Sequence, residues 1–295
     1  MSSEEMSDVV VVGAKVGSFV ITRILGQGGF GLVAGAVDKQ NNSIAIKFSE
    51  QYCEAMANEI EILTKLIDSG IVPEIYGSGS YKNYDFFTME WMAGSLADIL
   101  GMTDSKTFTT VVIQKIMYQG ILALKGLHAF GLIHQDIKAG NLLLKSPKGP
   151  RNTTRLVIGD LGLCAPHAQG KRIPGSIIPS GRVPYASPAQ QKGEQMTTWD
   201  DIIQFSYTPW TFQHMSMSRF LIFSPLEYKC GLLENPQTHL PQALQWMLCF
   251  YVSIQESLLE TGVDYNILTE AVQDMLRDSD GSEDLCMIGG NEILA

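Results

Sequence analysis

The hydrophobic pattern of the chain changes its period near Gly94, and this change limits the folds that the sequence can adopt. Residues 17–50 alternate three β-rich runs, SFVITRIL, LVAGAV and SIAIKF, with turn signals. This pattern predicts a meander of three antiparallel strands. From Ile113 to Leu127 the apolar residues instead recur at helical spacing. The sequence therefore predicts an α+β chain with a small β-rich lobe followed by a larger, mainly helical lobe.

The small lobe contains one helix and two more strands in this interpretation. Residues 52–67 place Met56, Ile60 and Leu63 at helical spacing with acidic residues between them. The run EIYGSGSYKNYDFFTMEWM then predicts two strands joined by a turn at Lys82 and Asn83. The helix is thus expected between the third and fourth strands of the lobe.

Composition and charge exclude several classes of protein. The chain has 295 residues, 45% of them hydrophobic, which is enough for a large core and argues against disorder. A formal net charge of -10 argues against a nucleic-acid partner bound through bulk electrostatics. Five scattered cysteines have neither metal-ligand nor redox spacing. With no export signal and no apolar run long enough for a bilayer, we expect a soluble intracellular protein, cytoplasmic or nuclear, without a membrane partner.

A glycine-rich turn joins the first two predicted strands. LGQGGFGLV, residues 25–33, places Gly26, Gly28 and Gly31 in this turn. Without Cβ atoms the turn can bring its amides against phosphate oxygens. An ordinary hairpin also favours glycine, so the turn alone leaves both interpretations open.

The next strand adds a cation near this turn. Lys47 ends the run IAIK, after the small residue Ala45. A strand lysine is usually a solvated edge charge, but a carboxylate on the following helix would hold it inside. We expect Glu59 to be that partner, with Glu54 and Glu61 as the competing candidates.

A polar island interrupts the apolar run LIHQDIKAGNLLL, residues 132–144. The pattern H-x-D-x-K-x-x-N, formed by His134, Asp136, Lys138 and Asn141, resembles the catalytic loop of eukaryotic protein kinases. The alternative is a turn whose polar groups cap a helix end. The resemblance implies that Asp136 accepts the proton of the attacking hydroxyl, Lys138 neutralises the γ-phosphate and Asn141 binds Mg²⁺, while His134 has an internal packing role.

A second acidic motif follows the polar island. LVIGDLGLC, residues 156–164, is a predicted strand that ends in Asp-Leu-Gly. It resembles the Asp-Phe-Gly motif of kinases, with Leu161 in place of Phe. The resemblance makes Asp160 a ligand of the Mg²⁺ that bridges the nucleotide phosphates.

Three further stretches resemble the casein kinase I group of kinases. MEWMAGSLADIL, residues 89–100, is similar to its hinge, with Met89 as gatekeeper and backbone groups of Glu90 and Met92 facing adenine. GRVPYASPAQQ and WDDIIQF are similar to two later segments, and the second makes Asp201 the acid that anchors the catalytic loop. The resemblance covers residues 17–205 well and implies catalytic roles for Lys47 and Glu59 too. The nucleotide-binding residues that it implies are Leu25, Gly26, Gly28, Gly31, Val33, Ala45, Lys47, Met89, Glu90, Met92 and Leu143.

The resemblance also sets the expected domain boundaries. Residues 1–16 are an N-terminal extension, and residues 17–278 form a kinase domain with lobes 17–92 and 93–278. Residues 279–295 are predicted to be an acidic tail, in which residues 279–285 have no fixed structure.

The family resemblance implies a serine/threonine kinase that uses ATP and Mg²⁺ and acts as a monomer on protein substrates. A lysine two residues after the catalytic Asp, here Lys138 after Asp136, is typical of serine/threonine rather than tyrosine kinases. Lys171, Arg172 and Arg182 suggest acidic or previously phosphorylated substrates, although solvated loop charges explain them equally well.

The alternative is a pseudokinase that serves as an interaction scaffold, with or without nucleotide binding. Arg182 replaces a Thr of the family pattern. The helix that begins at Trp199 meets Pro209 early and should end there, at the cost of buried apolar surface.

Gln135 generates a prediction about regulation. It replaces the Arg that would read a phosphate on the activation loop, so we expect activity without phosphorylation of that loop. Replacing Ser176 and Ser180 with Ala should leave the turnover number unchanged in a phosphotransfer assay. A large loss of turnover would contradict this interpretation of Gln135.

Overall fold

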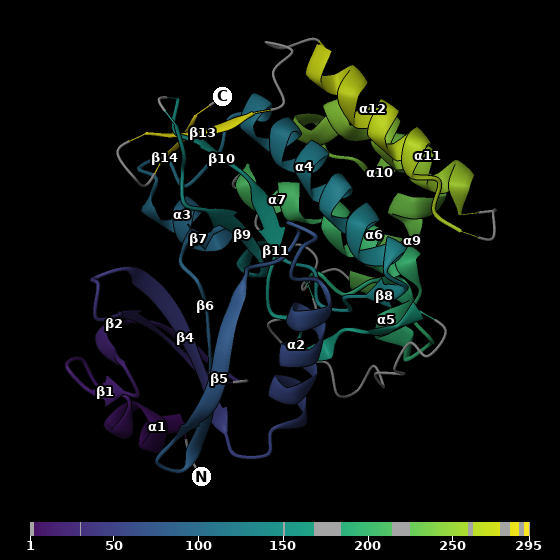
Figure 1. Ribbon diagram of the computed structural model, residues 1–295. Coiled ribbons are helices and arrows are strands. Elements are labelled where there is room, and N and C mark those ends of the chain that lie inside the picture. Colours follow the sequence, from purple (N-terminus) through teal and green to yellow (C-terminus); the bar gives the residue numbers. More distant parts are fainter. Residues whose placement is uncertain are drawn as a thin grey trace. The chain divides into compact units, whose positions relative to one another are not determined.

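The computed structural model describes residues 3–29, 31–149, 151–167, 184–213, 225–258, 262–277, 284–288 and 292–294. The chain divides into two compact units (Figure 1). Unit 1 comprises Met1–Met92 and Ile158–Cys164, and unit 2 comprises Ala93–Val157 and Ala165–Ala295. The predicted α+β class is confirmed, because unit 1 is built on a β-sheet and unit 2 is mainly helical.

Unit 1 contains a six-stranded sheet in the order β1-β2-β3-β4-β6-β5, with every neighbouring pair antiparallel. Its strands are β1 (Lys15–Val16), β2 (Phe19–Gly28), β3 (Gly31–Val37), β4 (Ser43–Glu50), β5 (Ile75–Tyr81) and β6 (Tyr84–Glu90). The helix α2 (Glu54–Lys65) follows β4, as predicted. Tyr81 pairs with Tyr84, so Lys82 and Asn83 form the expected two-residue turn, with Lys82 at φ 54°.

The strand register separates two faces of this sheet. Val33 pairs with Lys47, and Ala45 pairs with Met89. Because side chains alternate along a strand, these four residues share one face. The opposite face carries an apolar cluster that includes Leu32, Ile46 and Phe48.

The N-terminal extension covers that opposite face. Residues 3–9 form α1 (Ser3–Val9), which lies beside the first strands in Figure 1. Met6 and Val10 are 6% and 1% exposed and belong to the same apolar cluster. Burial of these side chains, each worth about 1.5 to 3 kcal/mol, makes the extension part of the core of unit 1.

Unit 2 combines short strands with helices. The strands form three small sheets: β7 (Met92–Ser95) with β9 (Leu142–Lys145) and β11 (Leu156–Ile158); β8 (Leu132–Ile133) with β12 (Ala165–Pro166); and β10 (Thr153–Thr154) with β13 (Leu285–Ile288) and β14 (Glu292–Leu294). The described α-helices are α3 (Leu96–Met102), α4 (Thr110–Ala129), α5 (Pro188–Lys192), α6 (Thr198–Ser206), α7 (Thr208–Phe212), α9 (Pro225–Glu234), α10 (Pro236–His239), α11 (Leu248–Ser257) and α12 (Tyr265–Arg277). Over the described residues, no helix is both long and apolar enough to span a membrane.

The core of unit 2 is organised around α4. Thr109 caps this helix by accepting a hydrogen bond from Val112 N–H, and most of its apolar side chains are buried. It packs against α12 and α6, and Figure 1 shows α12 running alongside it. At Gly120 the ring of Phe205 from α6 fills the space that a Cβ atom would occupy. A glycine in mid-helix here permits the close approach of the two helices.

The prediction that residues 279–285 have no fixed structure is wrong at Leu285, where β13 begins, and the described part of the tail beyond it forms strands. Cys286 pairs with Thr153 and with Leu294, so β13 stands between β10 and β14. The alternation of LCMI places Leu285 and Met287 on one face, where they are 0% and 2% exposed. Two buried apolar side chains explain why this segment is ordered despite its acidic neighbours.

The predicted early end of the helix after Asp201 is confirmed. The helix α6 ends at Ser206, and Pro209 lies in the first turn of α7, where the missing amide donor costs little. The expected loss of buried apolar surface is not seen in residues 207–212. Trp210 and Phe212 are 3% and 0% exposed, because both lie in α7 and pack in the core.

Two glycine substitutions test the packing of unit 2. In Gly120→Ala the new Cβ would stand 2.2 Å from the Phe205 ring. We expect a loss of about 1 to 3 kcal/mol in the free energy of unfolding, although alanine favours helix. Gly101 in α3 has open space around it. Because alanine favours helix over glycine, Gly101→Ala should raise the free energy of unfolding by about 0.5 to 1 kcal/mol. Urea unfolding of both variants checks this, and equal effects in the two would contradict the packing argument.

Candidate active site

Unit 1 brings Lys47, Glu59 and Asp160 together. The sequence predicts the pairing of Lys47 with Glu59. Lys47 Nζ lies 2.6 Å from Glu59 Oε2 and 2.9 Å from Asp160 Oδ1. Glu59, on the inward face of α2, is the partner, whereas Glu54 and Glu61 make no described ion pair with Lys47. The Asp160 side chain keeps 27% exposure, against 10% for Lys47 and 5% for Glu59. Asp160 is therefore the member of the cluster that solvent, or a ligand, can reach.

The charges of this cluster support one another. Burial alone would lower the pKa of Lys47, but the Glu59 and Asp160 carboxylates outweigh it and raise that pKa. Lys47 therefore stays protonated at neutral pH. Burial raises the pKa of Glu59, against the opposing effect of Lys47. Removing Lys47 would leave Glu59 buried beside Asp160 without its cation.

Sequence reasoning missed Asn58, which fixes the segment after Asp160. Its Nδ2 donates to the carbonyl oxygens of Gly162 and Cys164 at 3.1 and 2.9 Å. Asp160 itself has a left-handed backbone, with φ 58°, a conformation that Asp tolerates better than most residues. A helix amide one position before Glu59 thus holds the backbone that follows Asp160 against α2.

The glycine-rich turn lies between β2 and β3. A Cβ on Gly31 would stand 1.9 Å from the Phe48 carbonyl oxygen, and its φ of 130° disfavours any other residue. Gly26 and Gly28 instead have open space around them. At Gly26 and Gly28 no side chain lies between the backbone and its surroundings, which suits phosphate binding.

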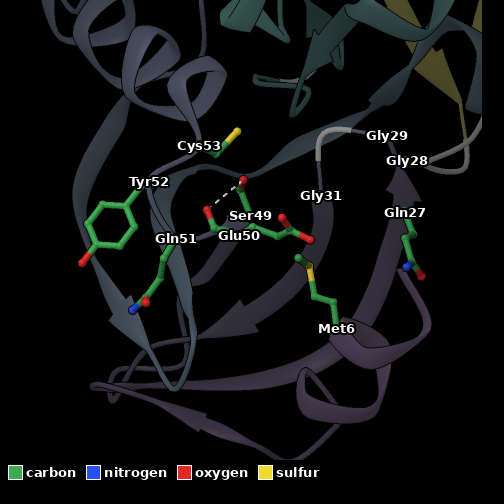
Figure 2. A pocket seen from close by; sticks show the side chains of 10 residues that line it. All are labelled: Met6, Gln27, Gly28, Gly29, Gly31, Ser49, Glu50, Gln51, Tyr52 and Cys53. Atoms are coloured by element: carbon green, nitrogen blue, oxygen red, sulfur yellow. Dashed lines mark hydrogen bonds between the residues drawn. The ribbon is translucent and has the colours of Figure 1, made fainter. Parts of the chain in front are cut away.

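A pocket of about 370 Å³ adjoins this turn, lined by Met6, Gln27, Gly28, Gly29, Gly31, Ser49, Glu50, Gln51, Tyr52 and Cys53. Figure 2 shows Met6 and Glu50 extending toward each other, while Tyr52 points away. The N-terminal helix thus contributes a wall to the space beside the glycine-rich turn.

The remaining predicted nucleotide-binding residues of unit 1 lie on or beside the sheet. Val33, Ala45, Lys47 and Met89 occupy the face that α1 leaves uncovered. Leu25 lies at a bulge of β2 and is 44% exposed. Glu90 N–H donates to Glu74 O at 2.8 Å, and Met92 ends the unit.

Unit 2 holds the second set of predicted residues, on the loop between β8 and β9. Lys138 Nζ lies 2.8 Å from Asp136 Oδ2. Asn141 Nδ2 donates to the Asp136 backbone carbonyl at 2.8 Å and contacts Oδ2 at 3.3 Å. Leu143 is half-buried between the buried Leu142 and Leu144. The loop therefore places a carboxylate, an ammonium group and a side-chain amide within hydrogen-bonding distance of one another.

The predicted anchor Asp201 holds this loop from α6. Its Oδ2 accepts from His134 N–H at 2.6 Å and its Oδ1 from Gln135 N–H at 2.8 Å. Its side chain is fully buried. His134 packs inside and its Nδ1 accepts from Asp136 N–H at 3.2 Å, which agrees with the expected internal role.

The sequence did not reveal His128 and Tyr265, which complete the anchor. His128 Nε2 lies 2.9 Å from Asp201 Oδ2, and its Nδ1 is hydrogen-bonded to Tyr265 Oη. Burial alone would raise the pKa of Asp201, but the hydrogen bond and charge of His128 and the His134 amide outweigh it. The pKa therefore lies below its ordinary value, and the carboxylate stays ionised.

The candidate metal ligands belong to different units. Asp160 is in unit 1 and Asn141 in unit 2. Carboxylate and amide oxygens suit a hard cation such as Mg²⁺. No group of three or more His, Cys, Asp or Glu residues placed to hold a metal occurs within the described ranges.

Several predictions concern residues outside the described ranges. Lys171, Arg172, Ser176, Ser180 and Arg182 all lie in the gap between residues 167 and 184. The substrate preference drawn from these cations therefore stays a prediction, as does the consequence of Arg182 standing in place of the family's Thr.

The segment after this gap is held by a buried lysine that sequence reasoning missed. Lys229 of α9 is fully buried, donates to the Ala186 carbonyl oxygen and lies 4.8 Å from the centre of the Tyr207 ring. Burial lowers the pKa of Lys229 to about 7. The Ala186 carbonyl oxygen, which also accepts from Gln191 Nε2, thus has one donor that titrates near neutrality.

Comparison with known proteins agrees with this geometry. Residues 19–203 match the family model described as protein kinase domain. The chain is 35% identical over 151 residues to the serine/threonine-protein kinase pakH of Dictyostelium discoideum, a match covering 50% of the chain and 28% of that protein. A casein kinase I-like protein of Caenorhabditis elegans is 26% identical over 201 residues, or 64% of the chain and 58% of that protein.

Solved structures give the same fold. The structure of vaccinia related kinase 3 superimposes with a TM-score of 0.69 over 94% of this chain and 95% of that one, at 14% sequence identity. By contrast, the chain spans only about a quarter of the Dictyostelium kinases dst4 and pakH, 27% and 28% of their lengths.

Lys229 generates a prediction about pH. Its folded-state pKa of about 7 lies below the 10.5 of a free lysine. Between these values the unfolded chain binds a proton that the folded chain has released, so folding becomes more favourable as pH rises. Relative to Lys229→Met, the wild-type chain should gain up to about 1.4 kcal/mol of unfolding free energy per pH unit above pH 7.

Urea unfolding at several pH values measures this trend. The exposed Lys39 provides the control variant Lys39→Met, for which no such trend is expected. A difference between wild type and Lys229→Met that does not change with pH would show that Lys229 keeps an ordinary pKa.

Proposed function

Since this chain belongs to the protein kinase family, we propose that it transfers the γ-phosphoryl group of Mg-ATP to serine and threonine hydroxyls of proteins. Relatives named as serine/threonine-protein kinases and the Lys138 position support this substrate class. The observation that carries the proposal is the loop in which Lys138 and Asn141 both contact Asp136, anchored by the ionised Asp201.

The loop residues have distinct proposed roles. Asp136 accepts the proton of the substrate hydroxyl and orients its oxygen. Lys138, 2.8 Å from the Asp136 carboxylate, neutralises charge on the transferred group. The amide nitrogen of Asn141 is bonded to the Asp136 backbone, so its oxygen Oδ1 is the atom for a metal ion. Catalysis on this scheme is positioning and charge neutralisation, without a covalent intermediate.

The residues of unit 1 would hold the nucleotide. Mg-ATP supplies the phosphoryl group, and its metal ion neutralises charge that develops on the phosphates. Lys47, kept protonated by Glu59, binds phosphate oxygens, and the partly exposed Asp160 is the carboxylate that binds the metal. The glycine-rich turn offers backbone amides to the phosphates. Adenine would contact Leu25, Val33, Ala45 and the hinge residues Met89, Glu90 and Met92. Unit 2 would add Leu143.

The finer features of the proposal rest on the sequence. Lys171, Arg172 and Arg182 favour acidic or already phosphorylated substrates, because guanidinium and ammonium groups pair with phosphate and carboxylate. We propose that the chain acts on proteins as a monomer inside the cell, without a nucleic-acid partner.

The second candidate function is a pseudokinase scaffold, and the short helix α6 is the observation that favours it. Two features weigh against it. The helix α7 restores the buried apolar surface, and the anchor Asp201 at the start of α6 keeps its bonds to the loop.

A phosphotransfer assay with Asp136→Asn decides between these functions. With Mg-ATP and an acidic protein such as casein, wild-type chain should transfer phosphate, and the variant should lose at least about 100-fold in kcat. Asp104→Asn, at an exposed position, is the matched control and should retain activity. ATP-dependent thermal stabilisation of the wild type without any transfer would overturn the enzyme proposal in favour of a scaffold.

A further inference from the structure

Three buried glutamines meet at the loop that carries Asp136. Gln135 precedes Asp136, Gln190 lies in α5 and Gln204 in α6. They are 1%, 2% and 1% exposed, respectively. Buried amide side chains are costly unless they are hydrogen-bonded. The partners of Gln190 and Gln204 explain why these two residues are present.

Gln204 contacts both peptide groups next to Asp136. Its Oε1 accepts from Ile137 N–H at 2.7 Å. Its Nε2 donates to the Gln135 carbonyl oxygen at 3.4 Å and to Gln190 Oε1 at 3.0 Å. The amide of Gln204 therefore spans Asp136, with its acceptor on one side and its donor on the other.

Gln190 strengthens the contact on the Gln135 side. Its Nε2 donates to the same Gln135 carbonyl oxygen at 3.0 Å. The backbone of Gln190 is itself fixed, because its N–H donates to Ser187 Oγ, which in turn donates to Asp200 Oδ1 at 2.5 Å. Gln190 thus connects the loop to the segment that follows Tyr185.

The chemistry of this contact suits glutamine and few other residues. A carboxylate would accept from Ile137 N–H but would have no donor for the Gln135 carbonyl. A lysine would donate but not accept. One planar amide satisfies both groups and adds no net charge beside Asp136.

Gln204 also completes the hydrogen bonding of the loop backbone. Asp201 accepts from the amides of His134 and Gln135, and His134 accepts from that of Asp136. Gln204 accepts from the next amide, that of Ile137. Gln135 needs such support, since its φ of 71° is unfavourable for a residue with a side chain.

We propose that Gln204 and Gln190 are positioning residues that fix Asp136 in the loop. Neither touches the reacting groups, and both act through the peptide groups beside Asp136. The effect on kcat that this inference predicts rests on the proposed kinase function. The restraint on the loop backbone is independent of that function.

The main variant is Gln204→Met, which keeps the size of the side chain and removes its hydrogen bonds. We expect kcat for phosphotransfer to fall about 10- to 100-fold with KM for ATP unchanged, since misplacing a catalytic group by about 1 Å costs as much. Gln190→Met keeps the Ile137 bond and should lose less, about 3- to 10-fold by the same reasoning. It also keeps the test informative should Gln204→Met not fold.

The matched control is Gln119→Met. Gln119 Oε1 accepts from Leu156 N–H at 2.9 Å, a bond that involves none of residues 134–141. The variant therefore also leaves a backbone amide without its acceptor, but away from the loop. It should change kcat less than Gln190→Met does, and loss of kcat in all three variants alike would show a general structural effect and overturn the proposal.

Hydrogen exchange separates this inference from the proposed function. The Ile137 amide should exchange faster in Gln204→Met than in wild type, and at the wild-type rate in Gln119→Met. This result would support the positioning role even if the wild-type chain transferred no phosphate. Unchanged exchange at Ile137, or an unchanged kcat in an active Gln204→Met, would overturn it.

Discussion

The buried carboxylate of Asp201 is the interaction on which unit 2 depends. It accepts from the consecutive backbone amides of His134 and Gln135 in the loop and from the His128 ring of α4. A buried charge with three donors is stable, whereas the same charge with one donor removed is costly. The strength of this interaction ties α6 and α4 to the loop, and through Tyr265 it extends to α12.

The two units use different means to hold their polar residues. Unit 1 relies on ion pairs, since Lys47 lies between two carboxylates. Unit 2 has the ion pair of Lys138 with Asp136 and the ionised anchor Asp201, and the neutral amides of Gln190 and Gln204 bond the backbone on either side of Asp136. A neutral network requires no modified residue to balance its charge. Activity without phosphorylation of the activation loop stays a prediction, since Ser176 and Ser180 lie outside the described residues.

Much of the fold and part of the site could be predicted from the sequence. The spacing of apolar residues predicted the strands of unit 1 and the helix α2. Burial on one face makes apolar residues recur with the period of the strand or helix. The pairing of Lys47 with Glu59 followed from the position of the acid in the middle of α2. The meeting of unit 1 and unit 2 residues around one nucleotide stays a prediction.

The remaining contacts leave no such signal. Asn58, Gln190 and Gln204 are single amides whose partners are backbone groups, and backbone groups are the same at every position. Their importance depends on a geometry that spacing does not encode. The C-terminal strands were missed for a related reason, since four residues such as LCMI are too short to outweigh the acidic residues beside them.

That C-terminal hairpin affects how the chain can be divided. Leu285 and Met287 are buried, β13 lies against α4 and β14 against α3. A version cut at residue 203, where the family match ends, or at residue 278 would strip this cover from α4. The exposed apolar surface and the open edge of β10 would then invite aggregation. Recombinant work on this chain therefore needs residues 285–294, although they match no sequence motif.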